Sequence, residues 1–519
     1  MSAIITDQFR ILSANNFVTS IASTENSYYS FVGLPNATDV NSMWNTTPLA
    51  PRDSFDDENT IWDTIIGLKK ITDSDVKRVI PKITWVSGTS YDMYRHDITR
   101  DNVSKPSDAT SLYGSNFYVI NSDFKVYICL QNGTNPENPN GRPSLDEPKF
   151  TDLEPRAAGP SGDGYLWKYL YTINPGDIIK FDSIDFIPVP SDWETSAENA
   201  SIRDNSKTSG QLKVVTITNR GEGLGVANRT YTRIPIRGNG TGAEATIIIG
   251  NDSKVESINI SRGGSGYTYG TVDLEGGGVP TGTIRPKFKV IIPPSGGHGA
   301  DIYRELGAKN VLVYSRIEND IEDPDFITGN QIARIGIVHN PKAYNSTTNL
   351  NKDKASGLYA LRLTGSAVTS FSPSPDTFIT QTVGVASTAV GRVVSYDNVT
   401  GVLKYWQEQS LAGFDTSGNQ LLNSKYGLKL NEFSSSVGAG GTTEISNDGV
   451  NTELKIDTSF TGISTVINNR TYNLGQSFVG GVSQPEVEKY SGNIIHINNR
   501  PSITRSTNQK EDIKVILQF

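Results

Sequence analysis

The glycine-rich loops of this chain contain residue types that could bind a phosphate or supply a serine nucleophile. Residues 238–242 read GNGTG, and a phosphate-binding loop of this kind needs a helix after it whose N-terminus holds the anion. Here residues 245–249 read ATIII, which predicts a strand. Ser265 lies in GGSGYT, which lacks the GxSxG elbow of a serine nucleophile. We therefore expect tight β-turns at both places, and neither a nucleotide site nor a catalytic serine.

The histidines and the cysteine do not form a metal-ligand pattern. No two histidines have the spacing of an HExxH helix, and the single cysteine, Cys129, has no Cys-x-x-Cys partner. The four histidines are His96, His298, His339 and His496. The sequence thus predicts no metal site and no cofactor.

The acidic residues could either bind calcium or catalyse the hydrolysis of a polysaccharide. The groups are Asp56-Asp57-Glu58, Asp163 and the cluster Glu318, Asp320, Glu322, Asp323 and Asp325. The cluster at 318–325 is read as a solvated acidic loop, with a Ca²⁺ site of carboxylate ligands as the alternative, although the EF-hand spacing is absent. A pair of carboxylates in an aromatic cleft, roughly 5–10 Å apart, would make the chain a polysaccharide-degrading enzyme.

The length and composition of the chain limit the classes of protein to which it can belong. The chain has 519 residues, with 36% hydrophobic residues, 49 glycines and 25 prolines. This length predicts two to four domains, and the composition favours short strands and turns over long helices. One cysteine rules out an intramolecular disulfide framework.

Charge and hydropathy argue against nucleic-acid and membrane partners. The net charge is −8 and no basic run is visible, whereas nucleic-acid binding needs a basic stripe. No apolar run approaches the roughly 20 residues that span a bilayer, and the first residues lack the pattern of a signal peptide. We therefore expect no nucleic-acid partner and no membrane partner.

The strand expected within residues 162–177 (GDGYLWKYLYTINPGD) is the most informative element. Its residues alternate with a period of two, and turn-forming residues bound it at both ends. One face carries an aromatic ridge, formed by Tyr165, Trp167, Tyr169 and Tyr171, with Ile173 beyond them. The opposite face is also partly apolar, so both faces are expected to be covered. This pattern favours a packed scaffold or an interface over an active-site loop.

The rest of the chain predicts a mainly β protein with a few short helices. Residues 59–70 have the apolar stripe of a helix, and a second short helix is expected from Asp73 to just before Pro81. Residues 214–225 and 255–268 form an imperfect repeat, which predicts a small duplicated β-domain. The expected architecture is a multi-sheet, sandwich-like core with inserted small β-domains.

Changes in composition divide the chain into three predicted parts. A discontinuous, β-rich core comprises residues 1–198, 300–345 and 481–519. A Gly-rich duplicated insert covers 199–299, and a Ser/Thr/Gly-rich β insert, compatible with a small barrel, covers 346–480.

Several motifs occur in an order that resembles one known family. They are IWDTIIGLKKITDSDVKRVIPKITW (61–85), GDGYLWKYLYTINPGD (162–177), IARIGIVHNPKA (332–343) and HINNRPSITRSTNQKEDIKVILQF (496–519). The chain resembles the "gene product eight" baseplate wedge subunits of T-even-like contractile-tail bacteriophages, over about half its length. It departs from that pattern in two β-rich inserts, near 200–299 and 346–480.

The resemblance implies a structural role and no catalytic residues. It implies a late viral assembly protein of the virion, located in the tail baseplate, assembled in the host bacterial cytoplasm, and binding itself as a homodimer and neighbouring wedge proteins. The residues expected to serve the core or an interface are Tyr165, Trp167, Tyr169, Tyr171, Asn499, Arg500, Pro501 and Phe519. A tail-associated polysaccharide-degrading enzyme and a host-surface adhesin, with 346–480 as its binding module, are the alternatives.

Overall fold

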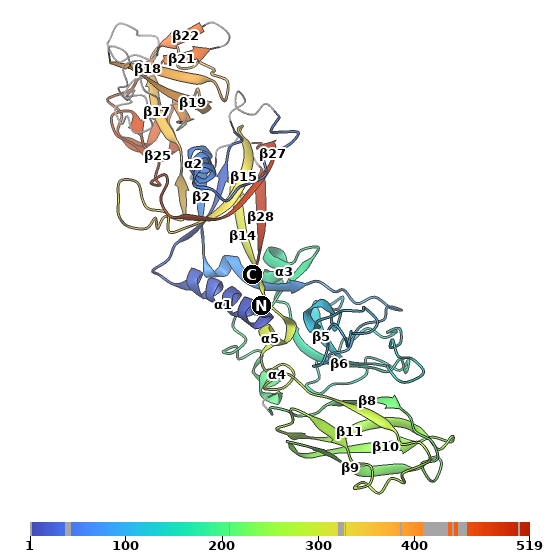
Figure 1. Ribbon diagram of the computed structural model, residues 1–519. Helices are drawn as coiled ribbons and strands as arrows, with labels where there is room; N and C mark the ends of the chain where they lie inside the picture. Colours follow the sequence, from blue (N-terminus) through green and yellow to red (C-terminus); the bar gives the residue numbers. More distant parts are fainter. Residues whose placement is uncertain are drawn as a thin grey trace. The chain divides into compact units, whose positions relative to one another are not determined.

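The computed structural model divides the chain into two compact units (Figure 1). Unit 1 comprises Met1–Val18, Val76–Leu312 and Val515–Phe519, and unit 2 comprises Thr19–Asp75 and Val313–Lys514. The residues described are 3–36, 43–206, 208–319, 326, 329–384, 387–407, 434–437, 441–444, 454–506 and 509–519. Helix α1 (Asp7–Ala22) and strands β14 (Asn310–Glu318) and β28 (Lys510–Gln518) extend across the division.

A three-stranded antiparallel sheet forms the centre of unit 1. Its order is β4-β5-β6, and β6 is the aromatic strand expected from the sequence. The strands are β4 (Tyr118–Ile120), β5 (Lys125–Asn132) and β6 (Tyr165–Thr172). Strands β3 (Val76–Pro81) and β7 (Phe186–Pro188) lie in a separate four-stranded sheet of order β28-β14-β3-β7. The short helices of this unit are η2 (Leu112–Gly114), α3 (Pro175–Phe181), α4 (Ala200–Asn205) and α5 (Ile302–Leu306).

The Gly-rich segment of unit 1 folds around its own apolar core (Figure 1). A four-stranded sheet of order β11-β10-β9-β12 and a pair of strands, β13 and β8, enclose it. The strands are β8 (Val214–Asn219), β9 (Thr230–Gly238), β10 (Thr241–Ile249), β11 (Val255–Ser265), β12 (Gly270–Val272) and β13 (Lys287–Ile291). The two copies of the predicted repeat contain β8 and β11. The hydrogen bond from Val255 N to the carbonyl of Arg220, the residue after β8, joins the two copies at 2.9 Å.

A five-stranded sheet of order β16-β2-β1-β15-β27 organises one part of unit 2. Its strands are β1 (Tyr28–Gly33), β2 (Ile65–Ile71), β15 (Gln331–His339), β16 (Lys354–Ser356) and β27 (Asn493–Thr504). Buried Tyr29, Phe31 and Leu68 join Trp62 of α2 (Phe55–Thr64) in its apolar core. This sheet is assembled from segments that lie hundreds of residues apart in the sequence.

A second sheet of unit 2 contains several strands of the Ser/Thr/Gly-rich segment. Its order is β22-β21-β18-β19-β20-β17-β23, with β26 also paired to β17. The strands are β17 (Tyr359–Thr364), β18 (Phe378–Gly384), β19 (Ser387–Asp397), β20 (Val402–Trp406), β21 (Ser434–Val437), β22 (Gly441–Glu444), β23 (Lys455–Ile456) and β26 (Val482–Ser483). A separate two-stranded hairpin, β24 (Gly462–Ile467) and β25 (Arg470–Phe478), follows β23.

The prediction of two helices between residues 59 and 80 is largely wrong. Helix α2 ends at Thr64, because Ile65 adopts an extended conformation (φ −62°, ψ 123°) and β2 begins there. The run IIGLKKI is β-branched at its first two positions and last position, and β2 pairs with a strand on each side. Only a single 3₁₀ turn, η1 (Asp73–Asp75), replaces the second helix before β3 starts. Tertiary strand pairing thus overrides the helical spacing.

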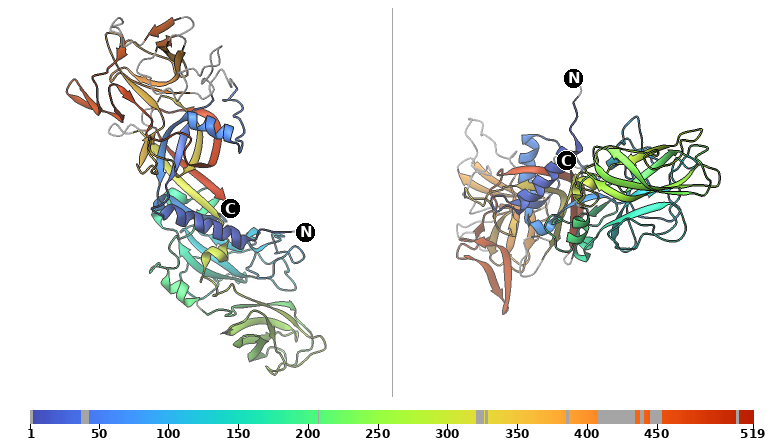
Figure 2. Two further views of the ribbon diagram at one scale, coloured as in Figure 1. Left: turned by 60° about the vertical axis from the view of Figure 1, so that its left-hand side comes forward. Right: turned by 90° about the horizontal axis from the view of Figure 1, so that it is seen from below.

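Helix α1, the longest among the described residues, was not expected from the sequence. Figure 2 shows it as one continuous helix after the N-terminal segment. Ile11, Ala14 and Ile21 are its buried positions, whereas Phe9 and Leu12 are exposed. No helix among the described residues is long and apolar enough to cross a membrane.

The prediction of a mainly β fold with a few short helices is confirmed. The predicted core is shared between the two units, the 199–299 insert falls in unit 1, and the 346–480 insert falls in unit 2. The boundaries of the three predicted domains stay a prediction.

Candidate functional site

The aromatic ridge of β6 is buried inside unit 1. Trp167 and Tyr171 are 0% exposed, and Tyr165 and Tyr169 are also buried. The rings of Tyr165 and Trp167 stack with centroids 5.3 Å apart, and the ring of Tyr91 meets Trp167 edge-on at 5.9 Å. Such aromatic pairs stabilise a core beyond the area they bury. In this chain the ridge packs against its own unit, which favours a core role over a dimer contact.

The tyrosine hydroxyls of the ridge hold neighbouring loops in place. Tyr165 Oη donates to the carbonyl of Arg142 at 2.7 Å and accepts from Tyr91 N at 2.8 Å. Tyr171 Oη donates to the carbonyl of Pro188, at the end of β7. Burial raises the pKa of both Tyr165 and Tyr171 well above the ordinary value. These hydroxyls therefore act as neutral hydrogen-bonding groups.

Lys168 lies on the opposite face of β6 and is 1% exposed. Its Nζ donates to the carbonyl of Leu153 at 2.8 Å. Burial lowers the pKa of Lys168 to about 8, and the negative charge of Glu305 opposes that shift. Both faces of β6 are thus covered, as the sequence pattern indicated.

A buried His–Glu pair, which no sequence pattern indicated, fixes the segment that leads into α5. His298 Nδ1 lies 2.5 Å from Glu305 Oε1, and Gly299 N donates to Glu305 Oε2 at 2.6 Å. The ring of Tyr94 meets the imidazole edge-on at 4.6 Å. The Oγ of Ser206 donates to the carbonyl oxygen of His298, and not to its ring. The arrangement therefore holds backbone and does not activate a serine.

The other three histidines lie in packed positions. His96 Nδ1 accepts from Ile292 N at 3.1 Å, and the ring of His339 stacks on Tyr28 with centroids 4.4 Å apart. Burial lowers the pKa of each of these three histidines, including His496 on β27. Within the described ranges, no three His, Cys, Asp or Glu side chains gather as metal ligands.

The acidic groups are dispersed. Asp163 accepts from Leu145 N and Tyr165 N, so it organises the turn before β6. Glu318 pairs with Lys510 at 2.8 Å, and positions 320–325 of its predicted cluster lie outside the described residues.

Each of the two units has a cleft with a carboxylate in its lining. The cleft in unit 2, of about 240 Å³, is lined by Asp376 and Trp406 among others, and the cleft in unit 1, of about 270 Å³, is lined by Glu154. Among the described residues that line them, each cleft has one carboxylate, whereas glycoside hydrolysis uses two.

The glycine-rich loops are turns between strands. Asn239 and Gly240 connect β9 to β10, and a Cβ on Gly238, the last residue of β9, would lie 2.2 Å from the carbonyl oxygen of Tyr269. Ser265 ends β11. Gly238 therefore allows two backbone segments to pack closely. Strand β10 follows this turn, so there is no helix N-terminus at this place to hold a phosphate.

The C-terminal motif lies on β27 and at the chain end. Asn499 Nδ2 donates to the carbonyl of Leu49 at 2.9 Å, and Trp44 Nε1 donates to the carbonyl of Arg500 at 2.9 Å. Pro501 is exposed on this edge strand, where a missing N–H costs no ladder hydrogen bond. In unit 1 the ring of Phe519 lies 5.6 Å from that of Phe17.

Arg334 of β15 links this motif to the rest of unit 2, a role that no local sequence pattern indicated. The side chain is 3% exposed and stacks over the Trp44 ring at 4.9 Å. Its guanidinium donates to Thr64 Oγ1 at 2.6 Å, to Asn499 Oδ1 at 3.3 Å and to Asn36 Oδ1. Burial lowers the pKa of Arg334 to about 10, so it remains charged at neutral pH. One cation thus ties three separate segments to β15.

Replacing Arg334 by lysine is expected to lower the free energy of unfolding by about 1–2 kcal/mol, because an ammonium cannot reproduce the planar fork. Urea unfolding followed by circular dichroism measures the change. Exposed Arg470 provides the matched control, since Arg470→Lys should leave stability within about 0.5 kcal/mol. If Arg334→Lys and Arg470→Lys are equally stable, the planar guanidinium of Arg334 is not required for stability.

Comparison with known families gives a match over the first part of the chain. The family model described as "Phage-Gp8: Bacteriophage T4, Gp8" matches residues 3–154, which include α1, α2 and strands β1 to β5. No curated protein matches the sequence. The family is one of structural proteins of the phage baseplate. The resemblance to the gene product eight family of bacteriophage T4 is therefore confirmed, and residues 3–154 carry it.

Proposed function

We propose that this chain is a structural subunit of the baseplate wedge in a contractile-tail bacteriophage. It binds a second copy of itself and neighbouring wedge proteins, and it catalyses no reaction. It is a late protein, assembled in the host cytoplasm and retained in the virion tail.

The match of residues 3–154 to the baseplate family is the observation that carries the proposal. The matched range provides parts of both units, since it contains β1 and β2 of unit 2 and β3 to β5 of unit 1. Further motifs of the resemblance, at 162–177, 332–343 and 496–519, form β6, β15, β27 and β28. The matched and the unmatched motifs thus share the same sheets.

The chemistry of the buried polar groups supports a structural role. Lys168, Glu305 and Arg334 each bond to main-chain or side-chain groups that hold segments in place. Groups that serve this purpose are already hydrogen-bonded and have little capacity left for a substrate.

Co-expression tests the proposal. The tagged chain is produced with the other baseplate wedge proteins of the same phage and examined by size exclusion with light scattering. We expect self-association of the isolated chain and a discrete, larger complex with at least one wedge protein. An isolated chain that remains monomeric and binds none of these proteins would contradict the proposal.

A further inference from the structure

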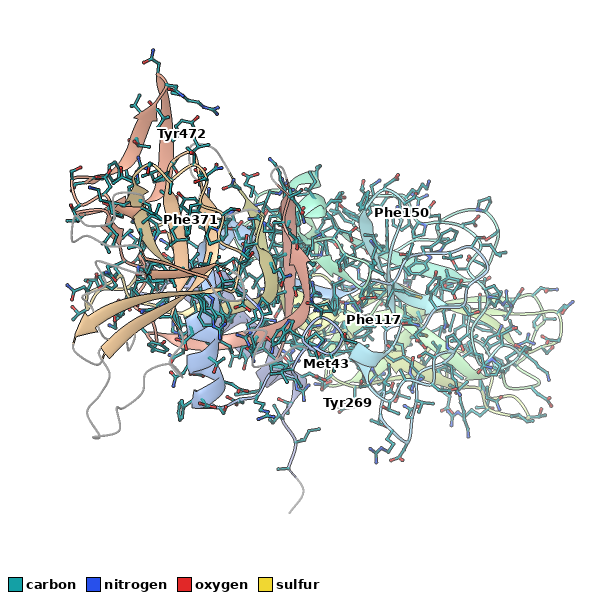
Figure 3. All side chains as sticks on the ribbon, turned by 90° about the horizontal axis from the view of Figure 1, so that it is seen from above. Met43, Phe117, Phe150, Tyr269, Phe371 and Tyr472 are labelled. Atoms are coloured by element: carbon teal, nitrogen blue, oxygen red, sulfur yellow. The ribbon has the colours of Figure 1, made fainter. Side chains whose placement is uncertain are left out.

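The Gly-rich segment of unit 1 has an apolar core of its own. That core extends from Leu212 to Ile292 and is separate from the central core, the cluster that contains the aromatic ridge of β6. Residues 210–292 are named the Gly-rich domain below. Figure 3 draws the side chains of both cores, with Phe117 labelled in the central core and Tyr269 labelled in the Gly-rich domain. Two separate cores within one unit indicate two bodies that are joined by linkers.

A short contact region beside the linkers joins the Gly-rich domain to the central core. Ser206 Oγ, before the domain, donates to the carbonyl of His298, after it, so the chain enters and leaves the domain at neighbouring points. Val214 and Ile291 lie opposite each other at one end of the β8–β13 pair and are buried in the central core. The next pair of opposed residues belongs to the domain's own core. The Val214–Ile291 contact is therefore placed to act as a pivot.

Three ion pairs among the described residues connect the Gly-rich domain to the rest of unit 1, and the domain supplies the cation in each. They are Lys213–Glu154 at 2.7 Å, Arg220–Glu137 at 3.2 Å and Lys289–Asp97. The Glu154 and Glu137 side chains are 63% and 53% exposed, so water screens both pairs and each contributes little free energy. Complementary charge thus positions the domain without holding it tightly.

A cleft of about 270 Å³ lies between the Gly-rich domain and the rest of unit 1. Gln131, Pro155 and Leu166 line it on one side, and residues of β8 and β11 line it on the other. A closely packed interface would fill a space of this size. Polar, loosely packed contacts between two bodies of one chain permit relative motion.

Residues 293–299, which return the chain to α5, have a backbone that suits a hinge. They include Gly296 and Gly297, whose φ angles are 88° and 92°. Glycine adopts positive and negative φ with similar ease, so these two positions can absorb a change in backbone angles. The His298–Glu305 pair fixes the segment directly after them. The linker thus combines two permissive positions with a firm anchor.

We infer that the Gly-rich domain is a hinged module, which swings about the Val214–Ile291 contact on its glycine linker and is held docked by the three ion pairs. When the domain swings away, its cationic face turns to solvent. Salt screens the ion pairs and therefore shifts the equilibrium toward the undocked state. This motion is a property of unit 1 and does not depend on the partners proposed above.

Spin labels on the domain and on the rest of unit 1 test the hinge. Asn251→Cys and Thr151→Cys provide exposed attachment points on the two bodies, and the native Cys129 is 0% exposed. Electron–electron distance measurements compare low salt with about 1 M NaCl, where the Debye length falls to about 3 Å. We expect one narrow distance at low salt and a second distance at high salt, with the ratio of undocked to docked molecules raised at least about tenfold.

Charge reversal provides the second measurement. Glu154→Lys sets a like charge against Lys213, whereas Glu275→Lys makes the same change in the Arg285–Glu275 pair, which lies wholly within the domain. The Glu154 and Glu275 side chains are 63% and 61% exposed, so both variants should fold. At low salt we expect E154K to raise the ratio of undocked to docked molecules at least about fivefold, and E275K to match the wild type. The exchange E154K/K213E should restore the single distance.

The outcomes decide the matter in either direction. One unchanged distance for the wild type at both salt concentrations and for E154K overturns the hinge, because the domain is then fixed to unit 1. Motion that appears with salt but not in E154K, or equally in E275K, overturns the role of the ion pairs. The co-expression test of the proposed function is independent of each of these results, so the two failures are distinguishable.

Discussion

Replacing Trp167 by alanine is expected to lower the free energy of unfolding by about 3–5 kcal/mol. The side chain is 0% exposed, stacks on Tyr165 and meets Tyr91 edge-on, so its removal leaves a large cavity. Its Nε1 has no hydrogen-bond acceptor among the described residues, so the expected loss comes from packing. Thermal and urea unfolding followed by circular dichroism measure it.

An exposed aromatic residue of unit 1 provides the control for this prediction. Tyr269 is 62% exposed, and Tyr269→Ala should change stability by less than about 0.5 kcal/mol. If Trp167→Ala leaves stability unchanged and weakens assembly instead, the aromatic ridge is an interface and not a core.

Lys168 should give the protein an unusual dependence of stability on pH. The pKa of Lys168 is about 8 in the folded chain against an ordinary value of 10.5, so between these values the unfolded chain binds more protons. The contribution of Lys168 to the free energy of unfolding therefore rises with pH, by up to about 3 kcal/mol. Below pH 8, Lys168 is charged in both the folded and the unfolded chain. The folded state then carries the full free-energy cost of burying the charged ammonium.

The measurement compares the wild type with Lys168→Met from pH 7 to pH 10. We expect the wild type to gain stability relative to the variant across this range, while the ionisation of tyrosines, common to both proteins, cancels in the difference. Exposed Lys287 is the matched control, and Lys287→Met should follow the wild type at every pH. Parallel curves for the wild type and Lys168→Met would show that the ammonium is solvated.

Local patterns predicted the strands well. The alternation of Tyr165 to Tyr171, with turn-forming residues at both ends, identified β6. These signals are local, because side chains in a strand alternate between faces and tight turns require particular residues.

Most of the failed predictions come from contacts between residues that lie far apart in the sequence. Residues 65–71 have helical spacing but form β2, because β1 and β16 provide hydrogen-bonding partners on both sides. Arg334 meets Thr64 and Asn36 across about 270 and 298 positions of sequence, a juxtaposition that no local pattern encodes. The His298–Glu305 pair was missed because the carboxylate lies on a helix that the sequence did not predict.

A density map of the intact phage tail tests the central claim most directly. The proposed function predicts density that fits unit 1 and unit 2 of this chain within the baseplate, in contact with other wedge proteins. A complete baseplate whose density contains neither unit would contradict it.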